Sequence, residues 1–337
     1  MKKISIDKMN ELFAAIAASK ALYMPVCDGK KGAKYAKWSE GTEYSQAANT
    51  SRSAKDFFFP QVEDMASFNV NGKEIEVIDT REECEDFVVF GVRACDAKSF
   101  DILDSVYLVD PVDSYYANRR EHGIIMTMAC NKPTDTCFCS TFGIDAANPM
   151  GDVSCWMNDN ELFLSANTEK GQALLDSISI LEEADDNAAD DIKASIKTIL
   201  DKLPLAGLSA DGMKEKTLME VFNSDKWAEL SESCLGCGTC TFVCPTCQCY
   251  DIRDYDTGHG VMRYRCWDSC MYSDFTLCAH GNTRTTQLQR FRQRFMHKLV
   301  YYPENNGGVF GCVGCGRCLR SCPISMNIVK VMKTLEG

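Results

Sequence analysis

The stretch Cys234–Pro245 reads CLGCGTCTFVCP, and its spacing returns at Cys312–Pro323 as CVGCGRCLRSCP. Each copy holds four cysteines separated by two, two and three residues and followed by proline, with glycine after the second cysteine. Three thiolates on one tight loop can hold three corners of an iron–sulfur cubane, while the fourth cysteine reaches the neighbouring cluster. The repeat therefore predicts two [4Fe–4S] clusters. Their ligands would be Cys234, Cys237, Cys240 and Cys322 for the first cluster, and Cys312, Cys315, Cys318 and Cys244 for the second.

Zinc is the other metal that paired cysteines bind. Zinc sites normally use two CxxC pairs with a long spacer between them, and rarely four cysteines at this spacing before a proline. The full pattern, present twice, favours iron–sulfur clusters. A zinc-stabilised interaction protein without a redox role is the alternative from another class.

Composition restricts the surroundings in which these cysteines work. The chain has 337 residues, 20 cysteines, 36 basic and 48 acidic side chains, and a net charge of −12. This acidic balance argues against a nucleic-acid partner. The start, Met1–Lys3, is followed by polar residues, and no run of about 18 apolar residues exists, so we expect neither a signal peptide nor a membrane partner. We expect a cytoplasmic protein, in which clustered cysteines bind metals rather than form structural disulfides.

The length favours two domains, and the cysteine distribution agrees, because 13 of the 20 lie between Cys234 and Cys322. We predict an α+β protein overall, with an α/β domain over 1–210 and a bacterial-ferredoxin-like domain over 211–337. Strand and helix signals alternate in the first domain, which predicts a mostly parallel sheet. A 67-residue insertion, 245–311, separates the two motifs and contains an amphipathic helix over 285–300. The strand signals lie at 22–26, 74–78, 87–92 and 123–128, and the helix signals lie at 6–20, 97–104, 115–122, 168–182, 190–203 and 213–231.

Two of the predicted buried strands lead directly into cysteines. Cys95 follows the apolar run 87–92, and Cys130 follows the run 123–128. In open α/β sheets, sites gather beyond the carboxyl ends of the strands. The nearby loop with Cys137 and Cys139 could fold back over them, so we predict a third [4Fe–4S] cluster with these four ligands. The alternative is that the four are packed, reduced thiols.

The insertion holds further cysteines, two of them in a CxC pair directly after the first motif. Cys247 and Cys249 could bind an additional metal centre together with Cys270, and the alternative is again buried thiols. The other cysteines have no partner pattern, and we expect them to be structural: Cys27, Cys84, Cys155, Cys266 and Cys278.

Two other features concern partners. No GxGxxG follows a strand and no GxxxxGK[ST] is present, so flavin and nucleotide would bind to other chains. From Arg263 to Lys298, seven basic residues face only two acidic ones. Cations near anionic clusters would raise their reduction potentials, although a docking site for an acidic partner or a plain solvated helix face would give the same pattern.

Six segments of the chain carry a resemblance to a known family. They are GVRACDAKSFDILD (91–104), CNKPTDTCFCSTFG (130–143), CLGCGTCTFVCPTCQCYDI (234–252), RCWDSCMYSDFT (265–276), RFRQRFMHKL (290–299) and CVGCGRCLRSCP (312–323). Together they resemble the family that comprises the anaerobic sulfite reductase A-subunit and the sulfhydrogenase (NiFe hydrogenase) beta subunit.

The resemblance implies a cytosolic electron-transfer subunit that performs no bond chemistry. Its partners would be an NAD(P)H-oxidising flavoprotein subunit, a catalytic subunit, and a ferredoxin as a further donor. The resemblance also implies that the matched cysteines 95, 130, 137 and 139 are cluster ligands. We expect the A-subunit of an anaerobic sulfite reductase, with the beta subunit of a cytosolic NiFe hydrogenase as the alternative.

Overall fold

The computed structural model describes residues 1–29, 32–47 and 50–336, and its contacts divide the chain into two compact units. The first unit comprises Met1–Phe58, Cys84–Gly207 and Val313–Cys315, and the second comprises Phe59–Glu83, Leu208–Cys312 and the chain from Gly316 onward. The units change between Gly207 and Leu208, whereas the domain boundary at 210–211 stays a prediction. The second unit also takes up Phe59–Glu83 from the N-terminal part of the sequence.

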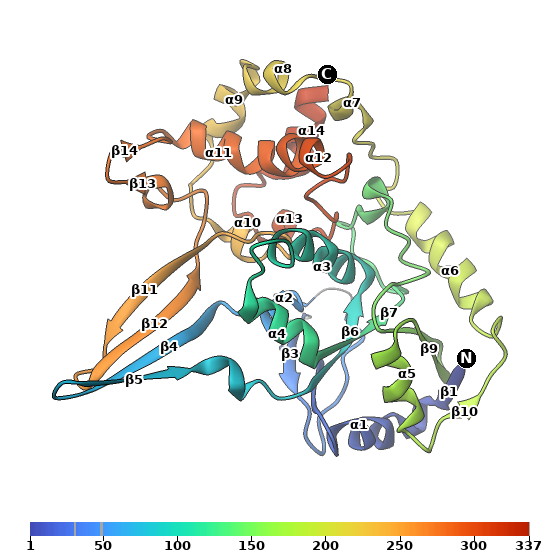
Figure 1. Ribbon diagram of the computed structural model, residues 1–337. Coiled ribbons are helices and arrows are strands. Elements are labelled where there is room, and N and C mark those ends of the chain that lie inside the picture. Colours follow the sequence, from blue (N-terminus) through green and yellow to red (C-terminus); the bar gives the residue numbers. More distant parts are fainter. Residues whose placement is uncertain (30–31, 48–49, 337) are drawn as a thin grey trace. The chain divides into compact units, whose positions relative to one another are not determined.

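An eight-stranded sheet forms the centre of the first unit (Figure 1), in the order β10-β1-β9-β8-β7-β6-β2-β3. Its four inner strands β2, β6, β7 and β8 are parallel, and the remaining pairings are antiparallel. The protein is therefore α+β with a parallel-rich sheet, as predicted. The strands are β1 (Lys2–Ser5), β2 (Ala21–Cys27), β3 (Ala33–Lys37), β6 (Phe87–Arg93), β7 (Gly123–Met128), β8 (Val153–Met157), β9 (Glu161–Ala166) and β10 (Glu182–Glu183).

Helices cover both faces of this sheet. Phe13 of α1 and Leu174 of α5 pack with Phe90 and Met126 on one face, whereas Ile196 of α6 packs on the other. Every residue of β6 and β7 is buried, as expected for strands covered on both sides. The helices of this unit are η1 (Ile6–Lys8), α1 (Met9–Ala17), α2 (Lys55–Phe58), α3 (Ala94–Tyr107), α4 (Ser114–His122), η3 (Cys139–Phe142), α5 (Glu169–Asp176) and α6 (Asp190–Asp201).

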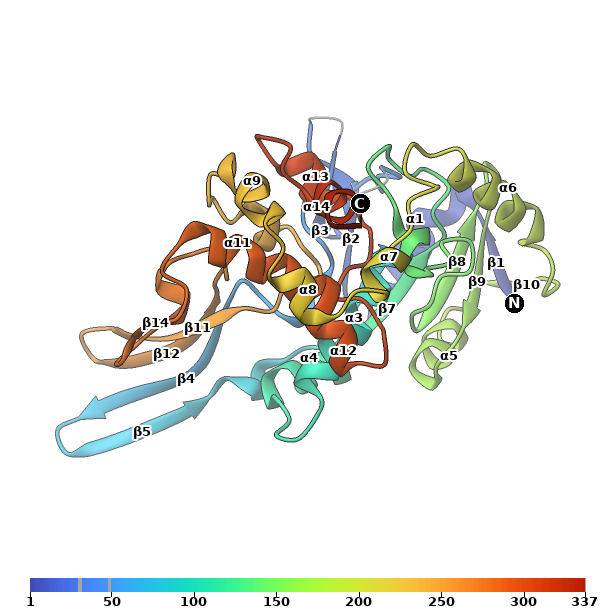
Figure 2. The ribbon, with the colours of Figure 1, turned by 90° about the horizontal axis from the view of Figure 1, so that it is seen from above.

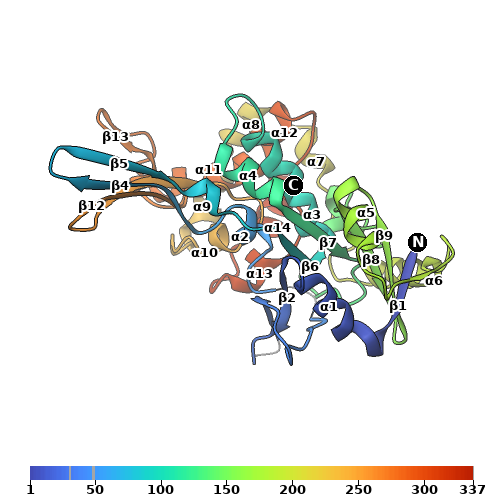
Figure 3. The ribbon, with the colours of Figure 1, turned by 60° about the horizontal axis from the view of Figure 1, so that its bottom comes forward.

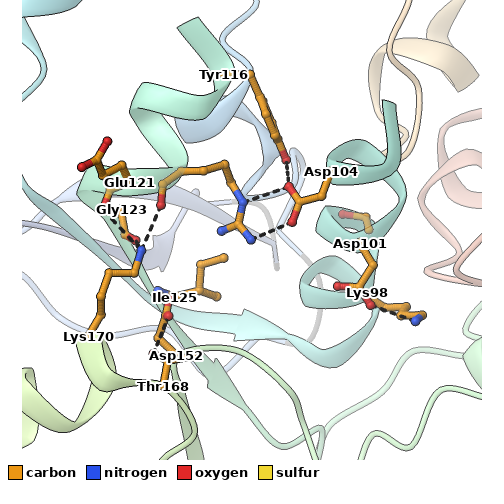
Figure 4. Close-up of polar contacts among 12 residues, drawn as sticks. Lys98, Asp101, Asp104, Tyr116, Glu121, Gly123, Ile125, Asp152, Thr168 and Lys170 are labelled. Atoms are coloured by element: carbon orange, nitrogen blue, oxygen red, sulfur yellow. Dashed lines mark hydrogen bonds and ion pairs between the residues drawn. The ribbon is translucent and has the colours of Figure 1, made fainter. Parts of the chain in front are cut away.

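A polar network fixes the helices beside β7 (Figure 4). Asp104 of α3 accepts hydrogen bonds from the hydroxyl of Tyr116 at 2.6 Å and from Nη2 of Arg120 at 2.9 Å, both on α4. Burial and the neighbouring Asp104 raise the pKa of Tyr116, so the phenol stays a donor. Asp152 accepts the backbone N–H of Ile125 at 2.8 Å. These contacts hold β7 in place before it leads to Cys130.

The second unit contains a four-stranded antiparallel sheet, ordered β11-β12-β4-β5. Its strands are β4 (Val62–Asn71), β5 (Glu74–Asp79), β11 (Tyr250–Asp256) and β12 (Gly260–Trp267). The 74–78 strand signal thus corresponds to β5, which belongs to this sheet and not to the larger one. At the base of the sheet, Nε of Arg265 donates to Glu63 at 2.6 Å, and both side chains are buried. Toward its other end the sheet extends away from the helices of its own unit as two hairpins (Figures 2 and 3).

Short helices make up most of the rest of the second unit. The predicted helix over 285–300 is present as α11 (Gln287–Met296) and the π-helix η5 (His297–Tyr301), and it begins with a capping box between Thr286 and Gln289. Phe291 and Phe295 of α11 are buried, with Phe291 against Trp227. The other helices include α8 (Leu218–Phe222), α9 (Lys226–Glu232), α10 (Thr239–Phe242), α13 (Arg317–Ser321) and α14 (Ile328–Glu336). Within the described residues, no helix has the length and apolarity needed to cross a membrane.

Candidate iron–sulfur centres

The two cysteine motifs repeat in backbone conformation as well as in sequence. Gly236 and Gly238 have φ of +66° and +71°, and their counterparts Gly314 and Gly316 have φ of +59° and +74°. This left-handed region is open to glycine at little cost. In both copies the second glycine caps a short helix, α10 or α13, which carries the third cysteine of its motif.

Four cysteines line one pocket of the second unit: Cys234, Cys237, Cys240 and Cys322. These are the four ligands predicted for the first cluster, three from the first motif and one from the second. The remaining lining is mainly apolar and includes Met271, Phe291, Phe295 and Met326.

Hydrogen bonds to sulfur already exist within this pocket. The N–H of Gly236 donates to Sγ of Cys234 at 3.5 Å, and the thiol of Cys237 lies 3.4 Å from Oγ1 of Thr239. That contact with Thr239 lowers the pKa of Cys237, whereas burial raises the pKa of Cys240. Hydrogen bonds to cysteine sulfur are one of the means by which proteins set cluster potentials.

The pocket also contains a buried cation that lacks a full set of partners. Arg294 is 3% exposed, and one amino group donates to the carbonyl oxygen of Cys240 at 3.3 Å. Its Nε and Nη1 have no hydrogen-bond partner among the described residues. Burial by itself lowers the pKa of Arg294, but nearby cysteine sulfurs, with Cys240 first, outweigh it and raise the pKa. A buried cation with free donors requires a negative charge nearby, and an anionic, thiolate-bound cluster would supply it.

A second buried cation lies among cysteines of the second predicted set. Lys298 is 4% exposed, and its ammonium donates to Oγ1 of Thr246 at 2.6 Å and to the carbonyl of Gly311 at 3.1 Å. Burial by itself lowers the pKa of Lys298, but Cys244, Cys247 and Cys312 outweigh it and raise the pKa.

The ligand set of the second cluster stays a prediction. Cys244, Cys312 and Cys318 lie in the second unit, and each of them is near Lys298 or Arg294. Cys315 is buried and belongs to the first unit, in the stretch Val313–Cys315.

The four N-terminal cysteines gather in the first unit. Cys95 lies in the first turn of α3, Cys130 lies just beyond β7, and Cys139 begins η3. Burial raises the pKa of Cys130, and it raises the pKa of Cys139 to about 12, with Cys137 contributing to both shifts. The buried guanidinium of Arg93 interacts electrostatically with Cys130 and Cys95. The structure thus brings these thiols to one end of the sheet, beside a buried cation.

The three candidate ligands in the insertion, Cys247, Cys249 and Cys270, take part in two separate thiol pairs. The thiol of Cys247 is hydrogen-bonded to Cys244, which lowers the pKa of Cys244 and raises that of Cys247. Cys249 is likewise hydrogen-bonded to Cys270, which lowers the pKa of Cys249 to about 7. The cysteines that we expected to be structural lie elsewhere: Cys155 is fully buried in the sheet core, Cys27 and Cys278 are exposed, and Cys84 and Cys266 are half-buried.

Across the described ranges, no three His, Cys, Asp or Glu side chains converge as the ligands of a single metal ion would. Thiolates on a cubane bind four different iron atoms and so stand further apart than ligands that share one ion. The four cysteines of the pocket therefore surround a common space rather than a single point.

Comparison with known proteins supports iron–sulfur clusters rather than zinc. Residues 233–326, which span both motifs and the insertion, match the 4Fe-4S dicluster domain family. The chain is also 35% identical over 274 residues to sulfhydrogenase 2 subunit beta of Pyrococcus furiosus, which covers 79% of this chain and 78% of that protein. The chain belongs to the sulfhydrogenase beta-subunit family of 4Fe-4S dicluster proteins. No solved structure matches it.

Family membership confirms the predicted family and dicluster domain. The chain is an iron–sulfur electron-transfer protein with [4Fe–4S] clusters. The sequence alone did not identify Arg294 and Lys298 as buried groups of the site, because they stand out only as members of a basic segment. Their i,i+4 spacing, interleaved with Phe291, Phe295 and Leu299, was the available signal.

Proposed function

We propose that this chain is the electron-relay subunit of a multisubunit oxidoreductase. It receives electrons from an NAD(P)H-oxidising flavoprotein subunit or from a ferredoxin, and it delivers them to a catalytic subunit. The observation that carries the proposal is the pocket in which Cys234, Cys237, Cys240 and Cys322 meet beside the incompletely paired Arg294. The absence of nucleotide-binding motifs from the sequence agrees with a flavin site on another chain.

The relative in Pyrococcus furiosus is named a sulfhydrogenase subunit, so our first proposal for the catalytic partner is a NiFe hydrogenase module. A sulfite reductase, which was our first expectation from the sequence, is the second proposal and rests on the resemblance of the six segments. The complex purified through a tag on this chain would distinguish the two. Hydrogen-dependent viologen reduction supports the first proposal, and viologen-dependent sulfite reduction supports the second.

The chain's own residues would hold and insulate the redox centres. When bound, [4Fe–4S] clusters supply one-electron redox chemistry at potentials set by charge, hydrogen bonds and exposure. Cys234, Cys237, Cys240 and Cys322 would hold the first cluster, while Phe291 and Phe295 keep water away from it. Arg294 balances its negative charge, and the second cluster would be held by Cys312, Cys315, Cys318 and Cys244 beside Lys298.

Two further centres belong to the proposal. Cys95, Cys130, Cys137 and Cys139 would hold a third cluster. Supporting this, Cys95 and Cys130 interact with the buried Arg93, and Cys130, Cys137 and Cys139 interact with one another. Cys247, Cys249 and Cys270 would contribute to an additional centre, supported by the hydrogen-bonded pair Cys249–Cys270.

Anaerobic iron analysis tests the ligand assignment. Cys237→Ala should lose about four iron atoms per chain, the content of one cubane, and should block electron delivery. Cys84→Ala and the exposed Cys278→Ala are matched controls that should keep all the iron. Equal loss in the controls would overturn the assignment, and a colourless wild-type protein that contains zinc would overturn the proposed function itself.

A further inference from the structure

The four-stranded sheet of the second unit exposes an unusual amount of apolar surface. Among the described residues, nine of the eighteen large apolar side chains that are exposed lie on this sheet. They are Val62, Val70, Ile75, Val77, Ile78, Tyr250, Ile252, Tyr255 and Val261. Apolar groups concentrated in this way mark interaction sites more often than scattered ones do.

Strand register places several of these side chains on one face. Val77 pairs with Phe68, Phe68 pairs with Val261, and Ile75 pairs with Val70. Residues paired directly across strands, and residues two positions apart, project from the same face. They form an end patch, defined as Phe68, Val70, Ile75, Val77 and Val261. Ile75 is 67% exposed and Val77 is 62% exposed.

The end patch is separate from the core of its unit. Further along the same face, Arg263 pairs with Asp254 at 2.7 Å, with both side chains about half exposed. Only beyond this pair does the face become buried, at Arg265 and Glu63. The patch therefore contributes little to folding.

In the part of the chain that the structure describes, β5 also has no partner strand along one of its edges. It is hydrogen-bonded to β4 on one side and is the last strand of the sheet. Edge strands usually carry lysine, proline or a bulge, because their outward N–H and C=O groups otherwise recruit another strand. β5 reads EIEVID and contains neither lysine nor proline. It therefore suits β-augmentation, in which an extended segment adds a strand to the sheet.

The charges of β5 indicate what kind of segment fits. Glu74 and Glu76 alternate with Ile75 and Val77 and so project from the opposite face, where Glu76 accepts a hydrogen bond from Asn69 at 3.2 Å. A second copy of this chain pairing through β5 would bring carboxylates close to carboxylates on that face, which is unfavourable. A segment with lysine or arginine on one face and apolar residues on the other would complement both faces of β5: its cations would lie beside Glu74 and Glu76, and its apolar residues beside Ile75 and Val77.

We infer that β5 and the end patch bind an extended segment of another subunit of the complex, with alternating apolar and basic side chains. This inference rests on the proposed place of the chain in a multisubunit relay. The segment would extend the sheet along β5, cover Ile75 and Val77, and pair its basic residues with Glu74 and Glu76.

A defined probe tests the chemistry on the isolated, cluster-containing chain. A labelled eight-residue peptide of alternating valine and lysine should bind at least tenfold more tightly than one of alternating valine and glutamate, as measured by fluorescence anisotropy. Ile75→Lys with Val77→Lys should abolish this preference, and Glu74→Lys with Glu76→Lys should reverse it. Val109→Lys with Val112→Lys, at two valines exposed to 51% and 52% in the first unit, is the matched control and should change nothing. Equal binding of the two peptides would overturn the inference.

The intact complex gives the second test. Backbone amides of residues 74–79 should exchange hydrogen at least tenfold more slowly in the complex than in the isolated chain. Unchanged exchange would overturn the inference, as would a wild-type dimer in light scattering that the Ile75→Lys/Val77→Lys variant abolishes. Dithionite reduction of the clusters in the isolated variants should equal that of wild type. Absence of reducible clusters in the wild type would refute the relay function instead, whatever the exchange data show.

Discussion

The backbone N–H of Phe138 donates a hydrogen bond to the carbonyl oxygen of Gly314 at 2.9 Å. Phe138 lies between Cys137 and Cys139, and Gly314 directly precedes Cys315. All of these residues belong to the first unit. A Cβ on Gly314 would lie only 2.6 Å from the backbone nitrogen of Cys139, and Gly314 has φ of +59°. This close approach holds a cysteine of the second predicted cluster against the loop of the third.

Gly314→Ala should therefore disturb both predicted centres. The left-handed conformation alone costs a non-glycine residue about 1–2 kcal/mol, and the contact with Cys139 adds displacement of the loop. We expect a lower free energy of unfolding and a loss of iron in anaerobic analysis. Gly143→Ala is the matched control, because Gly143 has φ of +70° but nothing within 4 Å of the added Cβ. Gly143→Ala should lower the free energy of unfolding but keep its iron. Equal iron contents in the two variants would show that the close contact between Gly314 and Cys139 is not needed for cluster binding.

Cys137→Ser tests the third predicted cluster. Oγ1 of Thr134 lies 3.3 Å from Sγ of Cys137, in a loop that carries no other predicted function. We expect the variant to lose about four iron atoms per chain and one EPR-active centre, with the signals of the other clusters retained. The exposed Cys27, changed to serine, is the control in the same unit. If Cys137→Ser keeps the full wild-type iron content, the proposal of a third cluster is wrong.

Repeated and periodic sequence patterns predicted part of the fold and of the site. The motif repeat predicted that Cys234, Cys237 and Cys240 meet Cys322, and the structure places all four around one pocket. Apolar runs located β6 and β7. The pairing of β4 with β12 could not be read in this way, because the paired residues Val62 and Cys266 are 204 positions apart in the sequence. The burial of Arg294 was hidden for a similar reason: whether a helical arginine faces solvent or a cysteine pocket depends on elements far away in the sequence.

Arg294→Met tests the electrostatic role of that arginine. A buried positive charge favours the reduced, more negative form of a nearby cluster. Its removal should lower the reduction potential by an amount on the order of 59 mV, equivalent to a tenfold change for a one-electron couple. EPR-monitored redox titration measures this shift. Arg294→Lys should leave the reduction potential close to the wild-type value, because it keeps the positive charge. Arg292→Met removes a cation stacked on Phe222 instead and should not change the reduction potential. Similar shifts in both methionine variants would contradict a specific role of Arg294.

Glu63→Gln tests the base of the four-stranded sheet. Nε of Arg265 lies 2.6 Å from the carboxylate of Glu63, and the guanidinium also stacks on Phe59. Arg265 is 1% exposed and Glu63 is 6% exposed, so the substitution leaves a buried cation without its counter-charge. Such a loss typically destabilises a protein by about 3–5 kcal/mol, and anaerobic urea unfolding should show it. Asp254→Asn removes the half-exposed partner of Arg263 in the same sheet and should have no measurable effect, because solvent screens that pair. If both variants unfold at the wild-type urea concentration, Arg265 and Glu63 do not hold β12 to β4.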